Sequence, residues 1–247
     1  MNLLIDAGNT RIKWALANGA DWLRSGILPT AEAADLAQHL AGHIGNLDAD
    51  LQPHCWVSNV ASNKVAEHIQ AACAARQYPV HFITAQASQC GVLNNYAQPS
   101  QLGSDRWAAL IAARHAARKS CLVINSGTAT TIDALSSAGT FSGGLIMPGI
   151  ELMQRSLHTA TSQLKPEQGE YAPFPRNTAD AILSGAIQAT CGAIERQHAL
   201  LDDASALVLL SGGAASLLLP HLNLPVQIMD NPVLQGLLLI AQNEDAK

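Results

Sequence analysis

Clustered positive charge is missing from this sequence. Only 13% of the 247 residues are charged, the formal net charge is −5, and no run of Lys and Arg occurs. Because a phosphate backbone is bound by clustered cations, we expect no nucleic-acid partner. The hydrophobic fraction of 48% suits a large buried core and argues against a disordered chain. The composition favours a protein that acts on small molecules.

Long apolar runs are also missing. The stretches Ala206–Leu210 and Leu234–Ala241 fall far short of the roughly 20 residues that a membrane-spanning helix needs. No basic region precedes an apolar run at the N-terminus, and Asp6 interrupts the run that is there, which argues against a signal peptide. We therefore expect a cytoplasmic protein with no membrane partner.

The cysteines form no paired pattern. They are odd in number and widely spread, and no C-x-x-C pair occurs. We expect small buried residues of a reducing compartment, with neither a disulfide framework nor a zinc site. They are Cys55, Cys73, Cys90, Cys121 and Cys191.

The common nucleotide and hydrolase motifs are absent, and a weak internal repeat is present instead. There is no Walker G-x-x-x-x-G-K-[ST] motif, no G-x-G-x-x-G motif and no G-x-S-x-G elbow. Leu3–Leu16 reads LLIDAGNTRIKWAL, and Leu122–Leu135 reads LVINSGTATTIDAL. Each predicts a β-hairpin with a Gly turn, followed by a third strand at Trp22–Ile27 or Thr140–Met147.

The rest of each half has an α/β pattern. We expect strands at Cys55–Val60, Val80–Thr84 and Leu207–Leu210, and a loop over Lys165–Asn177, which contains three prolines. The expected helices are Thr30–Ile44, Ser62–Ala75, Gly103–Ala117, Ile150–Leu164, Thr178–Leu201 and Asn231–Gln242. Two similar halves of this kind predict two related α/β domains that face each other across a cleft.

The first Gly turn has the composition of a phosphate-binding turn. Gly8 lets the backbone approach an anion, and Asn9 and Thr10 can donate hydrogen bonds to it. Asp6 is placed to hold Mg²⁺ through water, and Lys13 can flank the phosphates. An ordinary hairpin would accommodate the same residues, so this turn alone leaves both interpretations open.

Two further elements offer similar chemistry. The second turn, Asn125–Asp133, carries hydroxyls and amides, and we assign Thr128 to the ATP phosphates. The run Ser211–Ala215 places two glycines between a strand and a helix, which suits the approach of a nucleotide. A tight turn between a strand and a helix would look the same.

Together these three elements resemble the two phosphate loops and the adenosine loop of the actin, sugar kinase and Hsp70 ATPase superfamily. Within it, the sequence is similar nearly end to end to the type III pantothenate kinases, a family that includes Bvg accessory factors. The resemblance implies two ribonuclease H-like domains, 1–116 and 117–247. It is carried by DAGNT (6–10), Tyr96, GSDR (103–106), SGTATTID (126–133), GGLIMPG (143–149), Asn177–Thr178 and SGGAA (211–215).

The resemblance implies transfer of the ATP γ-phosphoryl group to the 4′-hydroxyl of pantothenate, the first step of coenzyme A synthesis. It implies that Asp105 is the general base, and that the enzyme is a homodimer that needs Mg²⁺ and is activated by K⁺ or ammonium. The implied pantothenate-binding residues are Tyr96, Gly103, Ser104, Asp105, Arg106 and Thr178. The implied ATP-binding residues are Asp6, Ala7, Gly8, Asn9, Thr10, Arg11, Ile12, Lys13 and Thr128.

The chemistry of these residues agrees with the resemblance. Phosphoryl transfer needs one base for the hydroxyl proton and groups that offset charge. Asp105 lies at an expected helix start, which favours an ionised carboxylate, and Arg106 can meet the pantothenate carboxylate or the moving phosphoryl group. Considered alone, these residues favour a simpler interpretation, in which Asp105 caps the helix and Arg106 is solvated.

One position departs from the family pattern. Members usually carry Asp where this chain has Asn125, and that Asp helps to bind the monovalent cation. We therefore expect weakened or altered activation by K⁺ or ammonium. Two alternatives stay open: another kinase of the superfamily, for a sugar or acetate, and a catalytically impaired homologue that acts as a regulatory ATP-binding protein.

Overall fold

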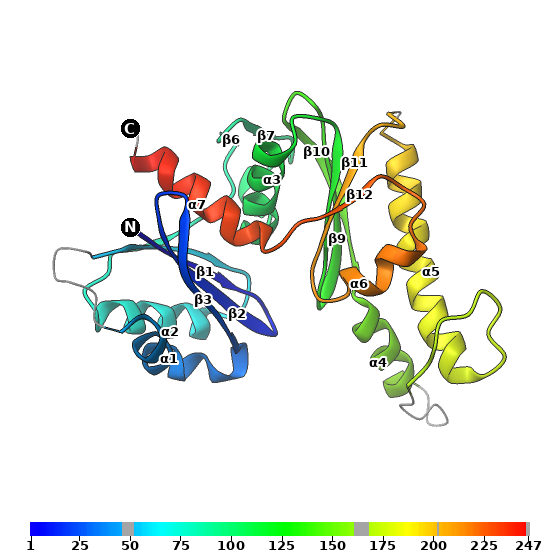
Figure 1. Cartoon of the computed structure of the whole chain (residues 1–247), viewed down its shortest axis with the longest axis horizontal. Helices are drawn as coiled ribbons and strands as arrows, with labels where there is room; N and C mark the ends of the chain where they lie inside the picture. The colour runs from blue at the N-terminus through cyan, green and yellow to red at the C-terminus, as the bar shows by residue number, and fades with distance from the viewer. Residues whose placement is uncertain (46–51, 161–167, 202, 246–247) are drawn as a thin grey trace. The chain divides into compact units, whose positions relative to one another are not determined.

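The computed structural model describes residues 1–45, 52–160, 168–201 and 203–245. The chain forms two compact units, each of mixed α/β structure. The first consists of residues 1–116 together with the segment from Pro232 onward, and the second of residues 117–231. Figure 1 shows the elements along the chain.

The first unit contains a five-stranded sheet in the order β3-β2-β1-β4-β5. β2 pairs antiparallel with both β1 and β3, whereas β4 lies parallel to both β1 and β5. The strands are β1 (Asn2–Ala7), β2 (Arg11–Asn18), β3 (Asp21–Pro29), β4 (His54–Asn59) and β5 (Val80–Phe82).

The second unit repeats this strand order, with β10-β9-β8-β11-β12. β9 pairs antiparallel with β8 and β10, and β11 lies parallel to β8 and β12. The matching order and directions confirm the internal repeat that the two Gly-turned hairpins predicted. The strands are β8 (Cys121–Ser126), β9 (Ala129–Leu135), β10 (Thr140–Pro148), β11 (Leu207–Ser211) and β12 (Val226–Ile228).

The repeat extends to one backbone contact. In each unit, the first strand (β1 or β8) has a parallel neighbour (β4 or β11). The loop that follows this neighbour donates an N–H to the carbonyl of the last residue of the first strand. Val60 donates to Ala7 at 3.0 Å in the first unit, and Ala214 donates to Ser126 at 3.1 Å in the second. Both first hairpins are therefore tied to the loop that follows a neighbouring strand.

Helices cover both faces of the first sheet (Figure 1). Alternate β1 residues, including Leu3 and Ile5, face the core shared with α1 and α2, where Leu40 and Ile69 are buried. The helices α3 and α7 pack together and against the same sheet on its other side. The elements are η1 (Thr30–Asp35), α1 (Leu36–Ile44), α2 (Asn63–Ala74), η2 (Pro99–Gln101), α3 (Ser104–Ala116) and α7 (Pro232–Asp245).

The closing helix α7 belongs to the first compact unit, although the expected second domain ran from 117 to 247. Its packing on α3 explains this placement. A Cβ atom added at Gly236 would lie 1.9 Å from the carbonyl oxygen of Ala108, so the two helix backbones lie in close contact at this point. Only a residue without a side chain permits this approach.

The helices of the second unit form a core with its sheet. Ile124 and Ile132 pack in a cluster with Ile187 and Ile194, which alternate with exposed residues along the longest helix. The elements are α4 (Ile150–Ala160), α5 (Thr178–Ala199), α6 (Ala215–Leu218) and η3 (Leu219–His221).

Most expected elements are present within a few residues of their predicted bounds. The expected helix over 150–164 ends at Ala160, and its remaining residues lie outside the described part. Of the expected loop, residues 165–167 also lie outside it, whereas 168–177 form no helix or strand, as predicted. Three short strands were not predicted: β12, β6 (Ser88–Gln89) and β7 (Val92–Asn94).

Two further expectations concern the whole chain. The five cysteines are free thiols, four of them buried and Cys90 partly exposed, which agrees with the predicted packing role. Among the described residues, no helix has the length and apolar character that spanning a bilayer demands.

Candidate active site

The turn between β1 and β2 is held by its own backbone. The N–H of Gly8 donates to the carbonyl of Arg11 at 3.0 Å. Thr30 fixes the turn from outside, because its hydroxyl donates to Gly8 O at 2.7 Å and its N–H donates to Thr10 O at 3.0 Å. Asn9 and Thr10 are exposed at the tip. The result is a rigid turn with polar side chains that a ligand can reach.

Asp6 lies near the end of β1, between two strands. Its residue pairs with Lys13 on β2 and with Ser58 on β4. Burial raises the pKa of Asp6 to about 7, and the negative charge of Asp105 adds to this rise, whereas the positive charge of Lys13 opposes it. The half-buried carboxylate of Asp6 therefore lies in the field of a second carboxylate.

Asp105 is the second residue of α3. Its Oδ1 accepts a hydrogen bond of 2.8 Å from the N–H of Arg106. A Cβ atom at Gly103 would lie 2.7 Å from Oδ1, so the carboxylate occupies the space that a side chain at 103 would need. Burial raises the pKa of Asp105, although the N–H and the charge of Arg106 lower it. Burial thus opposes the helix-start effect that the sequence predicted would keep Asp105 ionised.

Arg106 and Tyr96 contact each other. Nη1 of Arg106 donates to the Tyr96 hydroxyl at 3.2 Å, and the guanidinium carbon lies 5.8 Å from the centre of the tyrosine ring. Arg106 is only 6% exposed, so the cation–π contact forms largely away from water. The N–H of Tyr96 donates to Asn94 Oδ1 at 3.1 Å, which fixes the backbone at this point.

Two polar contacts of α3 were not predicted. The hydroxyls of Ser104 and Ser58 form a hydrogen bond of 2.9 Å, and Nε1 of the buried Trp107 donates to Gln89 Oε1 at 3.0 Å. Neither Ser58 nor Gln89 belongs to a recognisable motif. Only the expected alternation of the strand at 55–60 could have pointed to Ser58.

The turn between β8 and β9 resembles the first turn. The N–H of Gly127 donates to Ala129 O at 3.0 Å, and the buried hydroxyls of Ser126 and Thr130 lie 3.0 Å apart. Thr128 is exposed between these residues. The second unit therefore also presents a hydroxyl at the tip of a braced Gly turn.

Asn125 lies against the glycine pair of the second unit. A Cβ atom at Gly212 would lie 2.7 Å from Asn125 Oδ1 and 2.4 Å from the carbonyl oxygen of Ser126. Gly212 has φ +96°, a backbone conformation that favours glycine. The loop that follows β11 therefore crosses close to the end of β8, where the neutral amide of Asn125 is half-buried.

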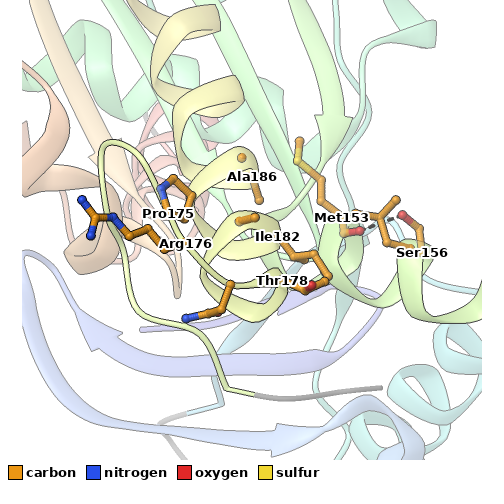
Figure 2. A pocket seen from close by; sticks show the side chains of 11 residues that line it. Met153, Ser156, Pro175, Arg176, Thr178, Ile182 and Ala186 are labelled. Carbon is orange, nitrogen blue, oxygen red and sulfur yellow. Dashed lines mark hydrogen bonds between the residues drawn. The ribbon is translucent and has the colours of Figure 1, made fainter. Parts of the chain in front are cut away.

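Thr178 begins α5. The preceding residue, Asn177, caps this helix, because its Oδ1 accepts the N–H of Asp180 at 2.9 Å. Thr178 lines a cavity of about 770 Å³, to which α4 contributes Met153 and α5 contributes Ile182. Figure 2 shows these side chains around the cavity in the second unit.

The predicted site residues fall into two groups, each within its own unit. In the first unit, the structure brings the residues around the first turn, Asp6 to Lys13, into the electrostatic field of Asp105, and it brings Tyr96 to Arg106. In the second unit, Asn125 and Thr128 lie on one hairpin, and Thr178 lies on a separate helix.

Comparison with known proteins identifies relatives over the whole chain. The model of the family described as "Type III pantothenate kinase" matches residues 2–199. A curated protein of that name from Aromatoleum aromaticum is 46% identical over 247 residues, which cover 100% of both chains.

Solved structures show the same fold at low sequence identity. A candidate Baf family transcriptional activator from Campylobacter jejuni aligns with a TM-score of 0.63 and 21% identity, covering 99% of this chain and 100% of that one. A candidate 2-dehydro-3-deoxygalactonokinase from Sinorhizobium meliloti aligns with a TM-score of 0.60 and 15% identity, covering 98% and 96%. These likenesses establish a fold of the sugar kinase type.

Proposed function

Because the chain belongs to the type III pantothenate kinase family, we propose that Asp105 is the general base of pantothenate phosphorylation. The chain is an ATP-dependent kinase that transfers the γ-phosphoryl group to the 4′-hydroxyl of pantothenate, the first step of coenzyme A biosynthesis. The main observation in support of this function is the family match. The structure adds an oriented carboxylate at residue 105.

The environment of Asp105 supports its role as the base. A carboxylate whose pKa is raised accepts a proton more readily than an ordinary one, and burial raises the pKa of Asp105. The hydrogen bond from the N–H of Arg106 orients the carboxylate through Oδ1. We assign the other oxygen, Oδ2, to the substrate hydroxyl. A single positioned base is what phosphoryl transfer asks of the protein besides charge compensation.

ATP binding is assigned to the two braced turns. The exposed tips with Asn9, Thr10 and Thr128 offer donors for phosphate oxygens, and the exposed Arg11 and half-buried Lys13 supply positive charge. The proposed ATP-binding residues are Asp6, Ala7, Gly8, Asn9, Thr10, Arg11, Ile12, Lys13 and Thr128.

Mg²⁺ fits the surroundings of Asp6. The negative charge of Asp105 raises the pKa of Asp6, and the charge of Lys13 offsets this only in part, since the pKa of Asp6 still reaches about 7. Among the described residues, no three His, Cys, Asp or Glu side chains gather as a metal cluster, so Asp6 would hold Mg²⁺ through water and together with ATP oxygens. When bound, the ion offsets negative charge on the phosphates.

Pantothenate binding is assigned to the start of α3 and to Thr178. The guanidinium of Arg106 can bind the pantothenate carboxylate, with Tyr96 holding the arginine in place. The cavity at Thr178 adds apolar walls from Met153 and Ile182. The proposed pantothenate-binding residues are Tyr96, Gly103, Ser104, Asp105, Arg106 and Thr178.

The monovalent cation is assigned to the position of Asn125. Its amide oxygen can coordinate K⁺ or ammonium, but it lacks the negative charge that an aspartate would supply. We therefore expect weak activation, which is tested by assaying turnover in Na⁺, K⁺ and ammonium. Strong activation with a low half-saturating concentration would contradict this assignment.

A cytoplasmic homodimer completes the proposal. Large apolar side chains are exposed on the second unit, including Phe174, which is 90% exposed, and Ile146, which is 65% exposed. We assign these side chains to an interface with a second copy of the chain, which would remove them from water. Light scattering of the purified protein gives the oligomeric state, and a monomer at micromolar concentration would contradict the proposal.

The deciding experiment is ATP- and Mg²⁺-dependent phosphorylation by the purified protein, with Asp105→Asn in parallel. We expect product with pantothenate and almost none from the variant. A panel with sugars and acetate distinguishes other kinases of the superfamily. A folded wild-type protein that forms no product with Na⁺, K⁺ or ammonium would favour a regulatory homologue instead.

A further inference from the structure

Ser58 and Ser104 form a hydrogen bond inside the first unit. Their Oγ atoms lie 2.9 Å apart, and either hydroxyl can be the donor. Ser58 is 0% exposed and Ser104 is 9% exposed, so water cannot readily take the place of either partner. A buried hydroxyl that loses its only nearby partner carries a desolvation penalty of about 1–3 kcal/mol. The pair therefore favours one relative position of the two segments.

These two segments carry the two interacting carboxylates. Ser58 lies on β4 in register with Asp6 on the neighbouring strand β1. Ser104 is the first residue of α3 and immediately precedes Asp105. The hydrogen bond thus joins the strand beside Asp6 to the helix start that presents Asp105.

The carboxylate of Asp105 follows the start of α3 closely. Its Oδ1 accepts the N–H of Arg106, and it lies in the space above Gly103 where a Cβ atom would be 2.7 Å away. Both contacts come from the residues that flank Asp105 in the chain. A shift of the helix start would therefore carry the carboxylate with it.

We propose that Ser58 is a positioning residue for phosphoryl transfer, acting through Ser104 on Asp105. This inference rests on the proposed role of Asp105 as the base. A displacement of about 1 Å between reacting groups can lower a rate by about a hundredfold. A bond that fixes the start of α3 therefore affects the turnover rate. Ser58 lies on a different element from every residue to which ATP or pantothenate binding is assigned.

The test compares Ser58→Ala and Ser58→Cys with wild-type protein in the kinase assay. We expect Ser58→Ala to lower kcat roughly tenfold, because the orientation of Asp105 is lost, with a change of less than about threefold in KM for ATP, whose assigned residues lie on other elements. Ser58→Cys places a slightly larger group with a weaker donor at the same position, so its kcat should lie between those of wild type and Ser58→Ala.

A second measurement separates positioning from a merely structural effect. In the Asp105→Asn background, Ser58→Ala should cause no further loss of the residual activity, because residues that act as a unit are not additive. Thr190→Val serves as the matched control. It removes a buried hydroxyl that donates to Ala186 O at 2.9 Å within α5, and it should leave kcat unchanged.

Each outcome decides the matter. Wild-type kcat in a folded Ser58→Ala would overturn the inference, as would an equal fold loss in the Asp105→Asn background. If Ser58→Ala does not fold, Ser58→Cys gives the same decision. A wild-type protein without pantothenate kinase activity, or an active Asp105→Asn, would instead overturn the proposed function, so the two failures are distinguishable.

Discussion

Asp105 acts on Asp6 through its negative charge, and together with burial this raises the pKa of Asp6 to about 7. The positive charge of Lys13 works in the opposite direction without cancelling the rise. The first unit thus holds two carboxylates with incomplete compensation. Such an arrangement disfavours the folded protein in the absence of a bound cation and favours binding of a divalent one.

Replacing Asp6 with Asn should therefore stabilise the protein without Mg²⁺ at alkaline pH. The folded-state pKa of Asp6, about 7, lies above the value of about 3.9 expected for an unfolded chain, so the folded state binds the proton more tightly. Stability from this group is present at low pH and is lost as pH rises through about 7. Asn does not ionise and has no such loss. We expect Asp6→Asn to raise the unfolding free energy by an amount on the order of 1–2 kcal/mol at pH 8. The gain stays this small because the side chain is only half-buried.

Chemical denaturation in EDTA at pH 5 and pH 8 measures this difference. The difference in unfolding free energy between Asp6→Asn and wild type should be larger at pH 8 than at pH 5. The variant should also have lost kinase activity. A difference in unfolding free energy that stays constant with pH would show that Asp6 ionises as freely in the folded protein as in the unfolded chain.

Gly103→Ala should separate activity from stability. The new Cβ atom would lie 2.7 Å from Oδ1 of Asp105 and 3.8 Å from Cγ1 of Val60, so the clash is with the end of a movable side chain. The carboxylate can move away with little effect on folding. We expect kcat to fall by about tenfold or more, while the unfolding free energy changes by less than about 1 kcal/mol.

The matched control is Gly192→Ala in α5. A Cβ atom there meets nothing within 4 Å, and Ala is the better helix former, so this variant should gain about 0.5–1 kcal/mol with unchanged kcat. Normal turnover of Gly103→Ala would mean that the position of the Asp105 carboxylate does not limit the reaction.

The repeated hairpins were predictable because their signal is local. In residues 3–16 and 122–135, alternating apolar residues and a central glycine determine a strand, a turn and a second strand without help from the rest of the chain. The same local pattern locates the predicted ATP-binding turns. The short strands β6, β7 and β12 have only two or three residues, too few for any alternation to be recognised.

Other features depend on distant partners and left no pattern in the sequence. The helix α7 is apolar over most of its length, which would suit packing in either unit, and its contacts with α3 and with the first sheet assign it to the first. Ser58 lies 46 residues from Ser104 along the chain, and a single serine in a strand is unremarkable. The raised pKa of Asp6 likewise comes from burial and from a charge on another element.

Asn125→Asp should strengthen activation by monovalent cations. The substitution adds a negative charge where the chain now offers a neutral amide oxygen, half-buried against the loop after β11. We expect the half-saturating K⁺ concentration to fall by roughly tenfold, which corresponds to about 1.4 kcal/mol of binding free energy. Turnover measured across K⁺ concentrations at constant ionic strength tests this. An unchanged half-saturation would place the cation elsewhere.

The two glycines of the loop after β11 should differ strongly in how much stability an alanine substitution costs. At Gly212, φ is +96° and a Cβ atom would lie 2.4 Å from the carbonyl oxygen of Ser126, a backbone atom that cannot move without disturbing β8. At Gly213, a Cβ atom meets nothing within 4 Å. We expect Gly212→Ala to lose at least about 2 kcal/mol of unfolding free energy, and Gly213→Ala to lose less than about 0.5 kcal/mol.

The pair also reports on function. Because the loop at Gly212 contacts both Asn125 and Ser126 at the base of the second turn, Gly212→Ala should raise KM for ATP as well. Denaturant titration and ATP-dependent kinetics of both variants measure the two effects. A larger rise in KM for ATP from Gly213→Ala than from Gly212→Ala would contradict this. The side-chain-free surface at 213 would then itself be a contact site for the nucleotide, and the close approach at Gly212 would be only structural.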